Sequence, residues 1–159
     1  MQEGKKIALL IDCDNVSHTA IEGVLEELAN HGTVNVRHAH GDWNNPSLSG
    51  WAKKLHPHAI RPMQQFAYTS GKNATDSAMI IDAMDLLYSG NIDAFALMTS
   101  DSDFTPLVLR ILESGFPVYG FGAKKTPQPF VDSCSPFIYI ENLVTSPEGE
   151  AEKSKQPGK

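Results

Sequence analysis

Unbroken hydrophobic runs alternate along this chain with segments in which hydrophobic residues recur every three or four positions. Residues 7–11 form one such run and residues 94–98 form another. Runs of this length are typical of strands that are buried on both faces of a parallel sheet. After each run the spacing becomes helical, over residues 21–29 and 104–112. We therefore expect strand–loop–helix units joined by right-handed crossovers.

The rest of the chain shows the same alternation of predicted strands and helices. Strands are predicted over residues 33–39, 59–62, 117–121 and 137–140, and helices over residues 48–55, 74–88 and around 129–133. Ser17 or Thr19 is expected to cap the helix over residues 21–29. Gly32 and Gly115 follow predicted helices, where glycine commonly ends a helix. Five or six strands and four or five helices predict a three-layer α/β/α sandwich around a mainly parallel sheet.

The chain divides into one folded domain and a short polar tail. Its 159 residues suit a single domain with a sizeable core. Residues 5–143 carry the hydrophobic pattern, whereas residues 144–159 are rich in Glu, Lys, Pro, Ser and Gly. We expect residues 5–143 to form the domain, the tail to be disordered, and residues 64–73 to form a mobile polar loop.

The charge and the cysteine content restrict the partners. A formal net charge of −6 argues against a protein that coats duplex DNA, because Lys and Arg contacts to phosphate supply most non-specific affinity. It does not exclude a nucleic-acid enzyme whose carboxylates gather in a metal site. The run at residues 7–11 is too short for a signal peptide or a membrane span, and two cysteines make no disulfide framework. We expect a cytoplasmic protein without a membrane partner.

Acidic side chains stand where predicted strands end or a helix begins. Asp12 ends the first apolar run, Asp101 and Asp103 follow the second, and Asp76 lies in the first turn of a predicted helix. In a parallel sheet these positions share one edge, where ligands bind. Clustered carboxylates repel one another unless a cation is bound, and oxygen ligands select Mg²⁺ or Mn²⁺. Such a site can activate water for in-line phosphoryl displacement.

Nearby polar residues fit this chemistry, and each also has a simpler explanation. Asn15 can donate a hydrogen bond to a carboxylate or to a phosphate. Lys72, Lys124 and Lys125 lie on loops expected at the same edge, where they can contact a single-stranded polyanion. The alternative is that the acids and Asn15 only form turns and helix caps, and that the lysines are solvated. Asp14 is ambiguous, because it can cap the following helix instead.

Histidine and cysteine patterns are weaker signals. His38 and His40 would share one face of a strand, but a zinc site needs at least a third ligand. Because no third ligand is evident in the sequence, we expect structural or surface histidines. Cys13 lies between two acids, so we expect a raised pKa and no role as a nucleophile.

Three short acidic motifs follow one another along the chain. They read Ile11-Asp12-x-Asp14-Asn15, then Gly71-Lys72-Asn73-x-x-Asp76 with Ile81-Asp82-Ala83-Met84, then Thr99-Ser100-Asp101-Ser102-Asp103-Phe104. Together they resemble the NYN domain, in its LabA-like branch of the PIN-like nuclease superfamily, over roughly residues 5–143. The resemblance implies a PIN-like α/β/α fold and a metal-dependent ribonuclease that acts on RNA. It also implies a Mg²⁺ or Mn²⁺ site made by Asp12, Asp76, Asp101 and Asp103, with Asn15 and Ser100 in support.

Two other functions stay open at this point. The segment Asp12-Cys13-Asp14 after an apolar strand also fits the opening motif of haloacid-dehalogenase-like phosphatases, in which the first Asp is the nucleophile. That chemistry needs a later Ser or Thr, then a Lys, then two acids, whereas Thr99 and Ser100 directly precede an acid. A non-catalytic RNA-binding or regulatory module with the same fold is the other alternative. The sequence leaves the oligomeric state open, and a homo-oligomer is one outcome.

Overall fold

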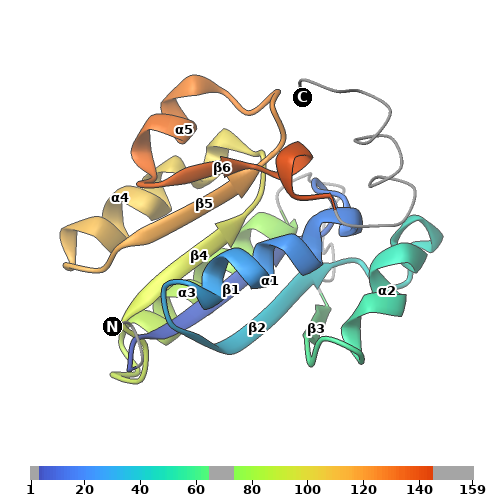
Figure 1. Ribbon diagram of the computed structural model, residues 1–159, viewed down its shortest axis with the longest axis horizontal. Helices are drawn as coiled ribbons and strands as arrows, with labels where there is room; N and C mark the ends of the chain where they lie inside the picture. The colour runs from blue at the N-terminus through green and yellow to red at the C-terminus, as the bar shows by residue number, and fades with distance from the viewer. Residues whose placement is uncertain (1–3, 65–73, 145–159) are drawn as a thin grey trace.

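Parallel strands form the central sheet of the computed structural model, which describes residues 4–64 and 74–144 (Figure 1). Within this part of the chain the sheet has six strands in the order β3-β2-β1-β4-β5-β6. The strands are β1 (Lys6–Asp12), β2 (Thr33–Gly41), β3 (Arg61–Gln64), β4 (Ala94–Met98), β5 (Val118–Gly122) and β6 (Phe137–Tyr139). The chain builds the sheet outward from β1 in both directions, so the gap between the ends of β1 and β4 is the topological switch point.

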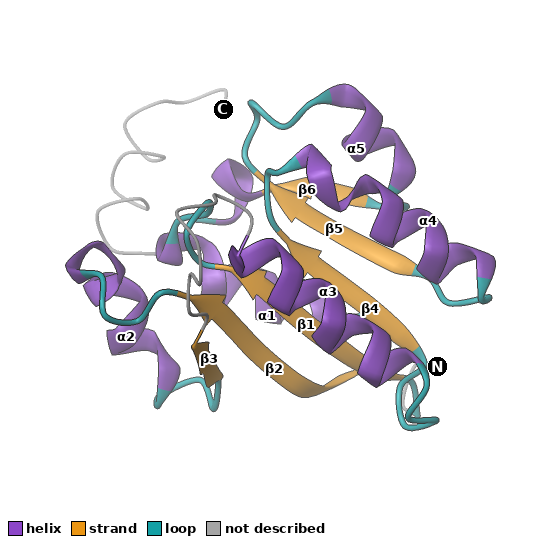
Figure 2. Ribbon diagram, turned by 180° about the vertical axis from the view of Figure 1, so that it is seen from behind, coloured by secondary structure: helices purple, strands orange, loops and turns teal. Residues whose placement is uncertain are grey.

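Helices cover both faces of this sheet. They are α1 (Ile21–Ala29), α2 (Ser49–Leu55), α3 (Ala74–Leu87), α4 (Thr105–Glu113) and α5 (Gln128–Ser133). Figure 1 shows α1 in front of the sheet, and Figure 2 shows α3 and α4 on the opposite face. The expected three-layer α/β/α sandwich is therefore confirmed, with an all-parallel sheet in place of a mainly parallel one.

The strand β1 shows why an unbroken hydrophobic run is needed at the centre of the sheet. Its odd-numbered residues Ile7 and Leu9 pack with α1 in one hydrophobic cluster. Its even-numbered residues Ala8 and Leu10 pack with α3 and α4 in a second cluster on the other face. Because successive side chains of a strand point to opposite faces, a strand covered on both sides must be apolar at every position.

Most element boundaries lie within a few residues of the predicted ones. Ser17 caps a 3-10 turn before α1 by accepting a hydrogen bond from the Thr19 amide at 3.2 Å. Gly115 follows α4 with φ of 91°, as expected for a glycine that ends a helix. The expectation for Gly32 was wrong, because α1 ends at Ala29 and Asn30 is its C-cap. Gly32 is instead a close-packed position, where a Cβ would lie 2.5 Å from the Lys5 carbonyl oxygen.

Two predictions fall largely on residues 65–73 and 145–159, which lie outside the described part of the chain. These are the mobile loop over residues 64–73 and the disordered tail over residues 144–159. The side chains of residues 74–76 also lie outside the described part. None of the described helices is both long enough and apolar enough to cross a membrane.

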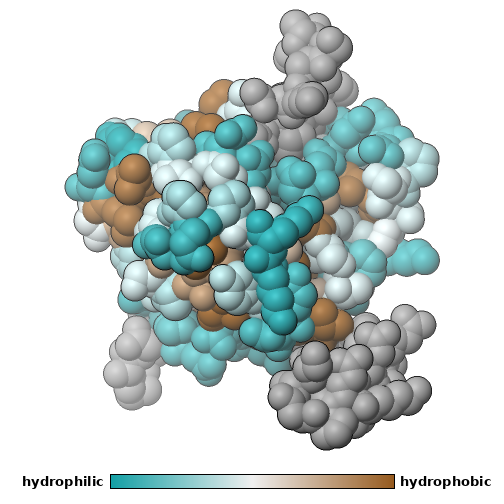
Figure 3. Space-filling model, turned by 90° about the horizontal axis from the view of Figure 1, so that it is seen from above, coloured by the Kyte–Doolittle hydropathy of each residue, from teal (hydrophilic) through white to brown (hydrophobic). Residues whose placement is uncertain are grey.

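Hydrophobic surface occurs as separate patches between hydrophilic side chains on the face seen in Figure 3. The large hydrophobic side chains that are exposed in the described part are Ile81, Tyr88, Leu109 and Leu112. They lie on or directly after α3 and α4. A homo-oligomer stays a prediction.

Candidate functional site

Two strand ends meet at the switch point and define the site. The register pairs Ile11 of β1 with Met98 of β4, so Asp12 and Thr99 follow side by side. Asp12 and Thr99 are both completely buried. The local sequence explains why these two residues are neighbours. Each apolar strand ends at a polar turn, and the parallel register places the two strand ends side by side.

The Asp12 carboxylate is held by two hydrogen bonds to one of its oxygens. Its Oδ2 accepts from the Asn15 side-chain amide and from the Thr99 hydroxyl, each at 2.8 Å. The other oxygen, Oδ1, is buried and has no hydrogen-bond partner among the described residues. Burial raises the pKa of Asp12; the bonds from Asn15 and Thr99 oppose this, and the charges of Asp14 and Asp101 raise it further. The predicted hydrogen bond from Asn15 to a carboxylate is thus confirmed.

Thr99 joins the two acidic turns. Its hydroxyl donates to Asp12 and accepts a hydrogen bond from the Asp101 backbone amide at 3.1 Å. The Asp101 carboxylate in turn accepts from the Asp103 backbone amide at 2.9 Å and caps the 3-10 turn Ser102–Phe104. Asp101 therefore does act as a cap, as the simpler explanation proposed, and it also places a negative charge near Asp12. Asp103 is exposed.

The turn after β5 completes this edge of the sheet. The Ser100 hydroxyl accepts a hydrogen bond from the Ala123 backbone amide at 2.8 Å and so ties the turn after β4 to the turn after β5. The Lys124 backbone amide donates to both oxygens of the Glu141 carboxylate, each at 3.0 Å. Lys124 and Lys125 are exposed. Ser100 thus supports the loop geometry, and within the described part of the chain no hydrogen bond joins it to Asp12.

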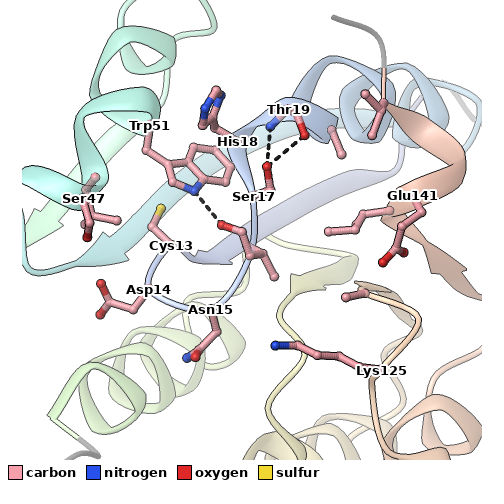
Figure 4. Close-up of a pocket in the computed structure, with 16 residues that line it drawn as sticks. Cys13, Asp14, Asn15, Ser17, His18, Thr19, Ser47, Trp51, Lys125 and Glu141 are labelled. Carbon is pink, nitrogen blue, oxygen red and sulfur yellow. Dashed lines mark hydrogen bonds between the residues drawn. The ribbon is translucent and has the colours of Figure 1, made fainter. Parts of the chain in front are cut away.

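A cavity of about 550 Å³ lies beside the acidic turns (Figure 4). Asp14, Asn15, Trp51 and Lys125 are among the residues that line it, whereas Asp12, Asp101 and Asp103 are not. Trp51 is fixed by a hydrogen bond from its indole nitrogen to the Val16 carbonyl oxygen at 2.9 Å. In Figure 4 the Lys125 side chain extends toward the loop that carries Asp14 and Asn15. The cavity is therefore adjacent to the acidic turns and carries both charge signs.

A histidine–aspartate cluster, which we define as His38, His40 and Asp82, lies one strand away. Asp82 Oδ2 lies 2.7 Å from His38 Nδ1 and 2.8 Å from His40 Nε2. Burial by itself raises the pKa of Asp82, but the hydrogen bonds from the two histidines outweigh it, and the pKa falls to about 2. The three residues could hold a metal ion.

The third member of this cluster was not predicted from the sequence. The two-residue period of a strand places His38 and His40 on one face, but nothing in that pattern connects them with Asp82 on the later helix. A usable signal exists, because Asp82 lies three residues after Met79 and directly before Ala83, both buried positions, so it falls near the buried stripe of the helix.

The structure brings some of the predicted site residues together and leaves others outside its described part. Asp12 and Asp101 are brought together, and Asp103 lies in the adjoining turn. The side chain of Asp76 and the whole of Lys72 lie outside the described part, so the four-carboxylate site stays a prediction. Burial raises the pKa of the Cys13 thiol, with the neighbouring acids adding to it, in the direction expected.

One solved structure of similar fold agrees with this architecture. A protein of unknown function from Vibrio parahaemolyticus has a similar crystal structure, with a TM-score of 0.71 and 23% identity over 88% of this chain and 95% of that chain. An oxidoreductase from Thermotoga maritima aligns with a TM-score of 0.44 and 16% identity over 87% of this chain and 38% of its own. No curated protein sequence matches the chain. The sequence pattern of the NYN domain matches residues 6–141, and the chain therefore belongs to the NYN domain family, within the PIN-like nuclease superfamily.

Proposed function

We propose that this protein is a metal-dependent ribonuclease of the LabA-like branch, which hydrolyses phosphodiester bonds of single-stranded RNA. The observation that carries the proposal is the buried Asp12 carboxylate beside Asp101. One oxygen of Asp12 is held by Asn15 and Thr99, and the other is buried without a partner. An unpaired buried carboxylate oxygen is costly unless something binds it.

The residues present fit a hard divalent cation. Asp12, Asp14 and Asp101 contribute negative charge to one place, and the latter two raise the pKa of Asp12. A cation at this place offsets both the repulsion and the desolvation of Asp12. Because the donors are oxygen atoms, Mg²⁺ and Mn²⁺ are the ions we propose. Bound there, such an ion supplies a water of lowered pKa and a positive charge for the phosphoryl group.

The roles of the residues follow from their contacts. Asn15 and Thr99 orient the Asp12 carboxylate, and the Thr99 hydroxyl also holds the Asp101 backbone. We assign Asp12 and Asp101 as the primary ligands, and Asp76 and Asp103 as ligands of a second ion or as groups that position water. Ser100 keeps the turn after β4 against the turn after β5.

Phosphate contacts are assigned to Lys72, Lys124 and Lys125. Lys125 lines the cavity together with Asn15, which bonds Asp12. A single strand whose phosphates lie along this cavity is therefore led toward the acidic turns, and the lysine charge offsets the negative charge of the chain at that point. In this proposal the cavity binds substrate and Asp12 marks the cleavage position.

The experiment is cleavage of a labelled single-stranded RNA by the full chain with Mn²⁺, compared with EDTA. The variant is Asp101→Asn, which keeps the side-chain oxygen that caps the following turn. We expect its rate to fall by at least roughly 100-fold, equivalent to about 2.7 kcal/mol of transition-state stabilisation. The matched control is Asp85→Asn, which changes an exposed aspartate of α3 and should keep the wild-type rate.

The other functions are outcomes of the same experiment. An Asp101→Asn variant as active as the wild type would remove Asp101 from the mechanism. Absence of cleavage, with a Mn²⁺-dependent rise in melting temperature, would favour the non-catalytic RNA-binding or regulatory module. Hydrolysis of a small phosphomonoester but not of RNA would favour the phosphatase.

A further inference from the structure

We propose that the histidine–aspartate cluster is a second metal site, which takes a divalent ion of the zinc class and fastens α3 to the sheet. This site is separate from the acidic turns of the proposed function. His38 and His40 come from β2 and Asp82 comes from α3, so an ion held by all three joins two elements.

The donor atoms converge on one point. His38 Nδ1, His40 Nε2 and a carboxylate oxygen of Asp82 all lie within 4.8 Å of one another. The two nitrogen–oxygen distances are 2.7 and 2.8 Å. Ligands of a tetrahedral zinc ion lie about 3.3 Å apart, given Zn–N bonds of about 2.0–2.1 Å. Each nitrogen–oxygen distance therefore has to lengthen by about half an ångström to suit a coordination site, and the two nitrogens already lie within 4.8 Å of each other.

Burial and accessibility suit such a site. The His40 side chain is 1% exposed, whereas those of His38 and Asp82 are 15% and 11% exposed. The inner ligand is therefore anchored in the core, and the outer two leave a route for an ion and for a water as fourth ligand. Two imidazole nitrogens and one carboxylate oxygen select Zn²⁺, Co²⁺ or Ni²⁺ over Mg²⁺.

The hydrogen-bonded state leaves one ring nitrogen of His40 unpaired, and metal binding would turn this nitrogen from an acceptor into a donor. When His40 donates its Nε2 proton to Asp82, a neutral ring has a bare Nδ1, and this atom is buried without a partner in the described structure. When Nε2 binds a metal instead, Nδ1 carries the proton and becomes a donor.

A carboxylate on the neighbouring strand faces the same side of the sheet as His40. Asp12 pairs in register with His40, and Leu10, two residues before it, packs with Met79 and Ala83 of α3. Asp12 therefore faces α3, as His40 does. Its Oδ1 is buried and has no hydrogen-bond partner among the described residues. A carboxylate behind a metal-bound histidine is a recurrent arrangement, and an oxygen with two lone pairs can serve a second ligand as well.

A metal ion here has a definite structural consequence. Asp82 lies on α3, whose first turn carries Asp76. Fastening Asp82 to β2 fixes the position of the helix relative to the end of β1. The ion would thus hold the two elements that carry Asp12 and Asp76 in one arrangement, without itself touching substrate.

The test measures metal binding by the full chain, not its activity. Protein freed of metal with a chelator is dialysed against Zn²⁺, and the bound metal is counted; Co²⁺ is added separately and its visible absorption is recorded. We expect His38→Gln to lose one equivalent of Zn²⁺ and the absorption of Co²⁺ bound by nitrogen ligands. His56→Gln changes an exposed histidine and should lose neither. Asp101→Asn should also keep both, which separates this site from the acidic one.

A measurement on the wild type covers the case in which the His38 variant fails to fold. Nitrogen-15 NMR of the histidine rings reports which nitrogen carries the proton. We expect Zn²⁺, but not Mg²⁺, to move the proton of His38 to Nε2 and that of His40 to Nδ1. Unchanged ring signals with Zn²⁺, or equal Zn²⁺ content in the wild type and a folded His38→Gln, would show that the cluster is only a hydrogen-bonded support.

Discussion

Replacing Thr99 by valine tests the proposal that one buried hydroxyl holds the two acidic turns together. The substitution keeps the shape of the side chain and removes only its hydrogen-bonding capacity. In the wild type the Thr99 hydroxyl donates to the Asp12 carboxylate at 2.8 Å and accepts from the Asp101 amide at 3.1 Å. Thr99 is completely buried, so water cannot take the place of either bond without a rearrangement.

The magnitude follows from the two bonds. A hydrogen bond to a charged group contributes about 1.5–3 kcal/mol, and an amide left unpaired in a half-buried place costs about 1 kcal/mol. We therefore expect Thr99→Val to lower the free energy of unfolding by about 3 kcal/mol. For a chain of this size that corresponds to a fall in melting temperature of roughly 6–12 °C.

Thr126→Val is the matched control. Thr126 is 7% exposed, and its hydroxyl donates to the Ala123 carbonyl oxygen, which also accepts a hydrogen bond from the Thr126 amide. Both partners are neutral, and the carbonyl keeps one donor after the substitution. We therefore expect a loss of only about 1 kcal/mol.

Urea unfolding of the wild type and both variants, in EDTA at neutral pH, measures these differences. If Thr99→Val costs no more than Thr126→Val, Thr99 does not hold the acidic turns. The comparison requires the same dependence of the unfolding free energy on urea concentration in all three proteins, because a changed slope indicates a changed native or unfolded state.

The remaining predictions concern other parts of the domain. Gly122→Ala places a Cβ 2.5 Å from the Thr99 carbonyl oxygen, so we expect a loss of about 1–3 kcal/mol in urea unfolding; an unchanged midpoint would contradict the close packing. Burial alone would raise the pKa of Glu22, but hydrogen bonds from a lysine and a histidine outweigh it and the pKa is lowered. Its stabilisation is therefore complete above its ordinary pKa and is lost as pH falls through the lowered one. Glu22→Gln should cost about 0.5–1 kcal/mol at pH 7, with the difference vanishing in acid; a pH-independent difference would count against the ion pair. Burial raises the pKa of Cys13, and raises that of Cys134 to about 11; both thiols should resist a thiol reagent at pH 8 until urea unfolds the chain, and rapid labelling of the native protein would refute this.

The fold could be predicted largely from the sequence, for a local reason. A strand in the middle of a parallel sheet is buried on both faces, so residues 7–11 and 94–98 must be apolar at every position. A helix that covers one face needs only a stripe, so residues 21–29 show the helical spacing. Burial thus leaves a direct record in the order of residues. The prediction failed at Gly32. A glycine in the sequence can mark the end of a helix or a place where two backbone segments approach closely, and at Gly32 it is the close approach to Lys5 that requires glycine.

The acidic edge was predictable only in part. Asp12 and Asp101 follow apolar runs, and parallel strands end at the same edge, so topology alone brings them together. The sequence did not indicate that the Thr99 hydroxyl would lie between them, nor which oxygen of Asp12 would be left without a partner. These depend on the register of β1 against β4 and on side-chain rotamers, which no single stretch of sequence contains.

The histidine–aspartate cluster shows most clearly what the tertiary structure decides. His38 and His40 share a strand face by the two-residue period of a strand, and the sequence determines that much. Their partner Asp82 is more than 40 residues away in the chain, and it meets them only because α3 crosses back over β1 and β2. Periodicity determines which face of its element a side chain occupies. The packing of the helix on the sheet determines which faces come into contact, and this packing places the three donor atoms around one point.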